Sequence, residues 1–132
     1  MVNKPMMSES ECRKRLAWQN KVHEEMKAKK RMSTTILCRK IIVPQNVFLP
    51  LSWDSNLLAK TVLAEVKTGD KVLDMGTGSG IQAIFAASKS TNVTAADVNP
   101  FAVRCAKLNV KLNKLSTRVK VMESDLFARV NG

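Results

Sequence analysis

The amino-acid sequence predicts an α/β fold with a Rossmann-like parallel sheet, preceded by a basic N-terminal helix and a short strand. Apolar segments of strand and helix length alternate over residues 71–123, a glycine-rich turn follows the first of these strands, and 45% of the 132 residues are hydrophobic. This length suits one domain. We expect residues 1–45 to form the helix and strand, and residues 46–132 to form the N-terminal half of a Rossmann-like domain.

The N-terminal segment is strongly basic. Residues 1–50 carry eleven basic and four acidic side chains, in a chain whose net charge is +11. Ser8 and Glu11 have capping-box spacing, which predicts a helix from about Glu9 to Met32. Its apolar residues form a narrow stripe of Trp18, Val22 and Met26. The helix is either a solvated helix docked by one thin face or a basic arm for RNA or an acidic protein.

The next segment predicts a strand and a short helix. The β-branched run ILCRKIIV indicates one strand from Ile36 to Val43, ended by Pro44. An apolar loop follows and either lines a pocket or closes the end of the core; its large residues are Phe48, Leu49, Pro50 and Trp53. Asp54 or Ser55 is the expected N-cap of the helix. Its expected buried residues are Leu58, Ala59, Val62 and Val66.

From residue 71 the pattern becomes a regular βαβαβ series. The expected strands are Lys71–Met75, Val93–Asp97 and Val119–Glu123, and the expected helices are Gly80–Ser88 and Pro100–Asn113. Asn99 is the predicted cap of the second helix, with Pro100 at its first position. Helical crossovers of this kind join parallel strands. The first strand would have an unpaired edge, which N-terminal elements or a second molecule would cover.

Composition excludes several kinds of site. The cysteines, Cys12, Cys38 and Cys105, are three in number without a CxxC pair, which argues against a disulfide scaffold and a thiolate zinc site. His23 is the only histidine. No apolar run reaches the roughly 18 residues of a membrane span, and the N-terminus lacks the apolar core of a secretory signal. We therefore expect a cytoplasmic protein without a metal site or a membrane partner.

The glycine-rich turn VLDMGTGSG predicts a ligand site. Glycines 76, 78 and 80 let a ligand approach the backbone, and the N–H groups of the following helix point into the same space. A dinucleotide site would have its third glycine at position 81, where Ile81 stands. Asp74 would repel a pyrophosphate but attract an ammonium group. The turn therefore favours a nucleoside with a charged amine over a nicotinamide dinucleotide.

Two further carboxylates end the next two strands. Asp97 is placed to accept hydrogen bonds from ribose hydroxyls. Asp125 is placed to accept from an exocyclic amine of a base, while the backbone N–H of Leu126 donates to a ring nitrogen. Because the carboxyl ends of parallel strands share one edge of a sheet, the three aspartates are expected to face one crevice.

These motifs resemble those of class I S-adenosylmethionine-dependent methyltransferases. VLDMGTGSG is similar to their D-x-G-x-G-x-G motif, and TAADVNPFAVRCAKLNVKLN and MESDLF are similar to the second-strand and third-strand motifs. The likeness covers about Asn46 to Phe127 and is closest to the HemK-like branch, which includes release-factor glutamine methyltransferases and related ribosomal RNA guanine methyltransferases. The preceding NVFLP also resembles that branch, and Asp54 is the only candidate for its upstream acidic residue.

The resemblance implies a cofactor site for S-adenosylmethionine in residues 46–132. Asp74, Gly76, Thr77, Gly78 and Gly80 would surround the methionine end of the cofactor. Asp97 would bind the ribose, Val98 would pack on the adenine, and Asp125 with Leu126 would read the adenine edge. Such an enzyme mainly aligns donor and acceptor, since a sulfonium is already a strong electrophile.

The resemblance also implies an acceptor, a nitrogen of a protein such as a release factor or of ribosomal RNA. The family's N-P-P-[YF] motif would grip that nitrogen, and the chain ends at Asn131 and Gly132 before any such strand. No catalytic residue is therefore expected, and the 132-residue chain is expected to bind the cofactor without transferring a methyl group. The alternative is a non-catalytic basic module that binds RNA or protein and keeps a relic of the cofactor loop.

Overall fold

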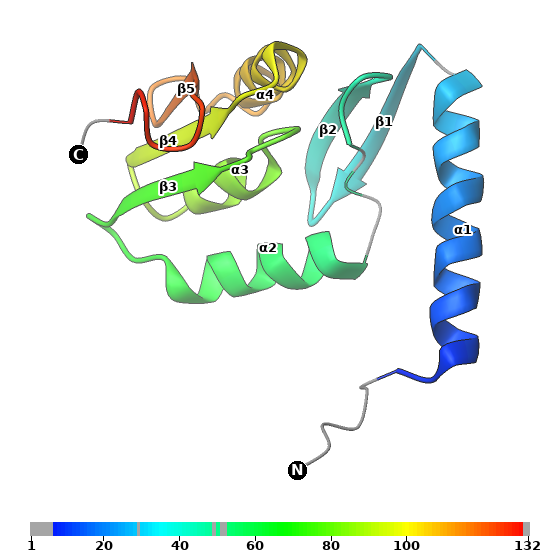
Figure 1. The fold of residues 1–132 in the computed structure, drawn as a ribbon. Helices are drawn as coiled ribbons and strands as arrows, with labels where there is room; N and C mark the ends of the chain where they lie inside the picture. Colours follow the sequence, from blue (N-terminus) through cyan, green and yellow to red (C-terminus); the bar gives the residue numbers. More distant parts are fainter. Residues whose placement is uncertain (1–6, 29, 49, 51–52, 131–132) are drawn as a thin grey trace. The chain divides into compact units, whose positions relative to one another are not determined.

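The computed structural model describes residues 7–28, 30–48, 50 and 53–130, without the side chains of residues 23, 26, 27 and 53. It has the expected α/β architecture with a parallel three-stranded sheet (Figure 1). The chain forms two compact units, Met1–Lys30 and Arg31–Gly132. The elements in order are α1 (Glu9–Ala28), β1 (Arg31–Ile36), β2 (Arg39–Pro44), α2 (Trp53–Glu65), β3 (Lys71–Met75), α3 (Ile81–Ala86), β4 (Asn92–Asp97), α4 (Pro100–Leu112) and β5 (Val119–Glu123).

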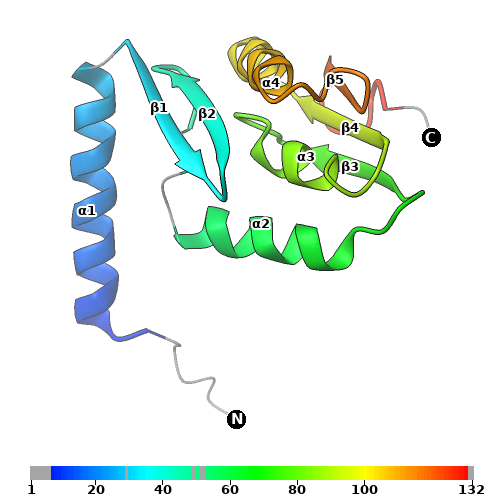
Figure 2. The same cartoon turned by 180° about the vertical axis from the view of Figure 1, so that it is seen from behind.

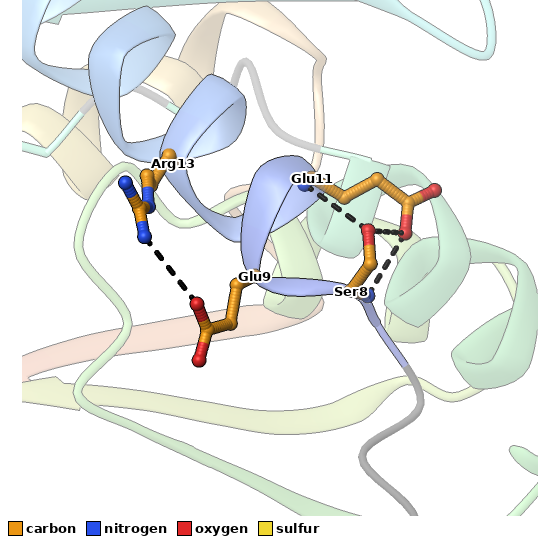
Figure 3. Close-up of polar contacts among 4 residues, drawn as sticks. All are labelled: Ser8, Glu9, Glu11 and Arg13. Atoms are coloured by element: carbon orange, nitrogen blue, oxygen red, sulfur yellow. Dashed lines mark hydrogen bonds and ion pairs between the residues drawn. The ribbon is translucent and has the colours of Figure 1, made fainter.

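The first unit consists of helix α1, which begins with the predicted capping box. The N–H of Glu11 donates to Ser8 Oγ at 3.3 Å, and the N–H of Ser8 donates to Glu11 Oε2 at 3.0 Å (Figure 3). Hydrogen bonds from the backbone and the hydroxyl of Ser8 lower the pKa of Glu11. The helix ends at Ala28 and not at Met32, which already belongs to β1. Leu16 and Trp18 are exposed, whereas Val22 is half-buried.

A hairpin replaces the single strand expected over Ile36–Val43. Strands β1 and β2 pair antiparallel from Arg31 opposite Pro44 to Ile36 opposite Arg39. Leu37 and Cys38 form the turn, with φ of +43° and +65°. Tight hairpin turns need positive φ and usually carry Asn or Gly there. The expectation was wrong because Leu and Cys inside a β-branched run carry no turn signal.

The second unit contains the predicted parallel sheet, in the order β3-β4-β5. The bounds of β3 and β5 match the prediction, whereas α3 is shorter than expected. Helix α3 packs on β3 and β4, and α4 packs on β4, β5 and α3. The Asn99 cap is confirmed, because its Oδ1 accepts from the N–H of Phe101 at 2.9 Å. Within the described residues, β3 has no strand on its outer edge.

The hairpin belongs to the same hydrophobic core as the sheet. Figures 1 and 2 show β2 on the side of the hairpin nearer α4, and the two elements pack together. Ile41 and Val43 of β2 are fully buried, as are Ile84 and Phe85 of α3. The second compact unit therefore begins at Arg31, and β2 packs with the region expected to begin at residue 46. The limits of the cofactor-binding region itself remain a prediction.

Helix α2 packs against α3. It begins at Trp53, so Asp54 and Ser55 lie in its first turn and neither is its N-cap as expected. Ala59 is buried, but Leu58 is half exposed because the helix contacts its neighbour through a narrow face. Phe48 is exposed, whereas Leu49 and the side chain of Trp53 lie outside the described residues. No described helix has the length and apolar character needed to span a membrane.

Candidate functional site

The glycine-rich turn between β3 and α3 adopts left-handed backbone conformations at all three glycines. The φ angles of Gly76, Gly78 and Gly80 are +71°, +54° and +82°. A Cβ atom built on Gly76 or Gly78 would meet no atom within 4 Å, whereas one on Gly80 would lie 3.1 Å from Cα and Cβ of Ala106. The first two glycines therefore border open space, and the third permits the close approach of α4.

Asp74, at the end of β3, shapes this turn. Its Oδ2 accepts from the Oγ1 hydroxyl of Thr77 at 2.6 Å and from the N–H of Ala83 at 3.0 Å. The cap position of α3 is Gly80, which has no side chain to cap the helix. Asp74 supplies that carboxylate from the neighbouring strand. Thr77 is 5% exposed; its side chain donates to Asp74, and its N–H and carbonyl are bonded to Ala96 and Gly80.

The other oxygen of Asp74, Oδ1, accepts no hydrogen bond from a described residue. Desolvation raises the pKa of Asp74. The bonds from Thr77 and Ala83 lower it by smaller amounts, and the nearby charge of Asp97 raises it further. A ligand ammonium at Oδ1 would offset the cost of keeping this buried group ionised.

The raised pKa predicts a pH-dependent contribution of Asp74 to stability. A carboxyl whose folded-state pKa exceeds its ordinary 3.8 stabilises the fold fully below that value, and the contribution is lost as the pH rises through the folded-state pKa. Asp74→Asn has no such titration. We therefore expect the free energy of unfolding of the wild type, relative to Asp74→Asn, to fall as the pH rises. Urea unfolding from about pH 3 to pH 7 measures it, and a constant or rising difference would contradict it.

Asp97, at the end of β4, ties the glycine turn to the neighbouring strand. Its Oδ2 accepts from the N–H of Gly78 and its Oδ1 from the N–H of Asn99, both at 2.9 Å. The N–H groups of Gly76 and Thr77 donate to the carbonyl of Ala96 at 2.8 and 2.9 Å. A carboxylate has about four lone-pair positions. Asp97 therefore orders the turn and keeps acceptor capacity for hydroxyl groups.

The third strand brings an exposed, partly apolar loop to the same edge. The N–H of Ser124 donates to the carbonyl of Asp97 at 3.0 Å, which joins the ends of β4 and β5. Ser124 is buried, and its Oγ donates to the carbonyl of Leu126 at 2.7 Å. Leu126 is 64% exposed and Val98 is 63% exposed. Asp125 is also exposed. The predicted residues of all three strands therefore lie at one edge, with two apolar side chains facing solvent.

Asn109 of α4 supports the site, and sequence reasoning missed it. Its amide pairs with both backbone groups of Ile42: Oδ1 accepts from the N–H and Nδ2 donates to the carbonyl, each at 2.8 Å. Nδ2 also donates to the carbonyl of Ser79 at 2.9 Å. This fully buried side chain thus links hairpin, helix and glycine turn. Its only signal in the sequence is a polar residue on the apolar face of a helix.

The chemistry of this edge is that of binding and orientation. It offers carboxylate oxygens, open space over two glycines and exposed apolar side chains, a set that suits a nucleoside carrying an amine. Within the described residues, no group of three His, Cys, Asp or Glu side chains is placed to hold a metal ion.

Comparison with known proteins relates the chain to methyltransferases. The sequence model of the ribosomal protein L11 methyltransferase (PrmA) family matches residues 49–131. A ribosomal protein L11 methyltransferase of Bacillus velezensis is 47% identical over 68 residues, 51% of this chain and 22% of the relative. A candidate protein N5-glutamine methyltransferase of Methanocaldococcus jannaschii is 44% identical over 80 residues, 60% of this chain and 39% of the relative. The chain thus spans between about a fifth and two-fifths of these relatives.

Solved structures show the same fold. Trm5 of Methanocaldococcus jannaschii in complex with adenosine superposes with a TM-score of 0.67 at 26% identity, over 74% of this chain and 30% of that protein. The Pyrococcus abyssi tRNA (uracil-54, C5)-methyltransferase in complex with S-adenosyl-L-homocysteine has a TM-score of 0.61 at 26% identity, over 74% of this chain and 24% of that protein.

Proposed function

Because this chain belongs to the ribosomal protein L11 methyltransferase (PrmA) family, we propose that its second unit binds S-adenosylmethionine at the carboxyl edge of the sheet. One observation carries the proposal: the backbone at Gly76 and Gly78 borders open space, and Asp97 ties this turn to the strand that ends beside the exposed Val98. The ligands named for two structural neighbours, adenosine and S-adenosyl-L-homocysteine, support it.

The residues present fit this cofactor. Gly76 and Gly78 would let it approach the backbone, and Oδ1 of Asp74 would face its ammonium group. Asp97 would accept from the ribose hydroxyls with the lone pairs that Gly78 and Asn99 leave free.

The exposed residues that follow the strands would complete the site. Val98 would cover the adenine, Asp125 would accept from its exocyclic amine, and the N–H of Leu126 would donate to a ring nitrogen. Thr77 would act indirectly, because its side chain donates to Asp74 and its N–H donates to the carbonyl of Ala96. Gly80 would act indirectly, since its missing Cβ makes room for α4.

When bound, the cofactor supplies a methyl group activated by a sulfonium. The chain's own residues would hold and orient the donor, which is the main contribution expected of a protein in this chemistry. We propose a nitrogen of a protein side chain as the acceptor, because relatives are named for ribosomal protein L11 and for N5-glutamine. A ribosomal RNA base is the second candidate, supported by neighbours named for tRNA methylation. We also propose a cytoplasmic location, where the free Cys12, Cys38 and Cys105 stay reduced.

Calorimetric titration of the chain with S-adenosylmethionine tests the proposal. We expect the wild type to bind it in preference to ATP and to reduced nicotinamide dinucleotide. Val98→Asp should weaken binding about tenfold or more, about 1.4 kcal/mol, because a carboxylate would replace the apolar surface under the adenine.

Leu112→Asp is the matched control for this experiment. It places the same charge at an exposed leucine in the last position of α4, and we expect it to leave cofactor affinity unchanged. Binding of S-adenosylmethionine no tighter than that of ATP would refute the proposal. An equal loss in the two variants would refute the role of Val98.

A further inference from the structure

The charges of the second unit are segregated along the chain and in space. Residues 31–53 and 98–122 contain nine Lys or Arg residues and no Asp or Glu. The two segments meet because β2 packs on α4, and Nδ2 of Asn113 donates to the carbonyl of Lys40 at 2.9 Å. The carboxylates of the sheet lie instead at the ends of the strands. Positive charge is therefore concentrated on α4 as well as in the N-terminal segment.

Four cations of this region, Arg104, Lys107, Lys111 and Lys114, form what we call the α4 stripe. The spacing of Arg104, Lys107 and Lys111 places them along one side of the helix, and Lys114 follows in the turn after Leu112. The opposite side is buried through Ala102, Ala106 and Asn109, and all four stripe residues are exposed. From Arg104 to Lys111 the stripe runs about 10 Å.

Within the described residues, none of the four stripe residues forms an ion pair; the ion pair between Glu9 and Arg13 lies in α1. At its N-terminal end the guanidinium of Arg104 lies 4.8 Å from the ring centre of Phe101. Phe101 is half exposed and follows shortly after Val98 of the candidate site. A row of cations that ends in a stacked Arg–Phe pair offers phosphate contacts and a surface on which a base can stack.

We propose that the α4 stripe binds the sugar-phosphate backbone of single-stranded RNA. RNA fits better than an acidic protein because the surface combines uniform positive charge with an aromatic platform, whereas protein interfaces centre on a larger apolar core. The exposed Leu108 and Leu112 beside the stripe are what a protein partner would cover, so an acidic peptide is the necessary comparison. Binding here does not require the cofactor and goes beyond the proposed function.

Fluorescence anisotropy with an oligouridine of about 20 nucleotides tests this inference, in the full chain without cofactor. The test variant carries Lys107→Gln, Lys111→Gln and Lys114→Gln. Each phosphate contact contributes about −0.7 to the slope of log affinity against log salt. We therefore expect the variant to bind about tenfold or more weakly at about 0.1 M salt, with a slope smaller in magnitude by about 2.

The matched control carries Lys60→Gln, Lys67→Gln and Lys89→Gln, which removes the same charge from exposed lysines of the same unit. It should bind within about twofold of the wild type. An equal loss in both variants would overturn the proposal in favour of net charge alone, and absence of RNA binding by the wild type would overturn it outright. Poly-glutamate binding as tightly as RNA, with the same dependence on the stripe, would overturn it in favour of an acidic protein. Calorimetry with S-adenosylmethionine separately reports whether the cofactor site is intact.

Discussion

Gly80→Ala is expected to lower the free energy of unfolding by about 2–5 kcal/mol. Two costs add up at this position. An L-residue in the left-handed conformation costs about 1–2 kcal/mol, and Gly80 has φ of +82°. The new methyl group would also lie 3.1 Å from Cα and Cβ of Ala106, and overpacking of this kind costs about 1–3 kcal/mol because the helix backbone must move. Urea unfolding followed by circular dichroism measures the loss.

Gly69→Ala separates the two costs. Gly69 has φ of +90°, but a Cβ there would meet no atom within 4 Å. We expect it to lose only the conformational part, about 1–2 kcal/mol. Equal losses at the two positions would show that contact with Ala106 does not limit the approach of α4.

Asn109→Leu is expected to destabilise the chain by about 3–5 kcal/mol. Leucine has the same branched shape as asparagine, although it is larger, and it cannot pair with the backbone groups that Asn109 satisfies. The N–H of Ile42 would lose its bond to Oδ1, and the carbonyls of Ile42 and Ser79 would lose their bonds to Nδ2. A buried polar group left without a partner costs about 1–3 kcal/mol. Thermal and urea unfolding would measure the loss.

Asn113→Leu is the control, one helical turn further along the chain. Its Nδ2 donates to the carbonyls of Lys40 and Asn109. Asn113 is half-buried, so water can replace it, and we expect a loss of about 1 kcal/mol or less. A loss at Asn109 no larger than this would mean that water readily satisfies Ile42 and Ser79.

The parallel sheet could be predicted because its signals are local. Strands β3 and β5 have the expected bounds, and the cap of α4 is an Asn followed by Pro. The three-residue spacing of Ser8 and Glu11 likewise identified the start of α1. At the two helix starts, neighbouring side chains satisfy nearby backbone groups, so the local sequence carries the information.

The hairpin could not be predicted because its stability comes from distant residues. The turn at Leu37 and Cys38 has no favourable turn residue. What favours it is tertiary structure: β2 buries Ile41 and Val43 and pairs Ile42 with Asn109, 67 residues away in the sequence. Propensity in a short segment does not report contacts of that range.

For the site, the sequence indicated which residues lie there but did not indicate the hydrogen bonds that they make. The structure brings the ends of the three strands together through Asp97, whose contact with Gly78 had no sequence signal. It also shows a hydrogen bond from the hydroxyl of Thr77 to the carboxylate of Asp74. The expected class I methyltransferase fold is confirmed, but the HemK-like branch is not, because the matching family is PrmA. Cofactor motifs are shared between branches and do not identify the acceptor.

The contact between β2 and α4 also lowers the chemical reactivity of one thiol, that of Cys105. Cys105 is buried, its Sγ donates to the carbonyl of Ile42 at 3.2 Å, and desolvation raises its pKa to about 11. Cys12 and Cys38 are exposed. The thiolate is the reactive form. An oxidant or alkylating reagent therefore reacts with Cys12 and Cys38 at once, and with Cys105 only when the hairpin separates from α4. The rate at which Cys105 is modified therefore measures how often the hairpin separates from α4.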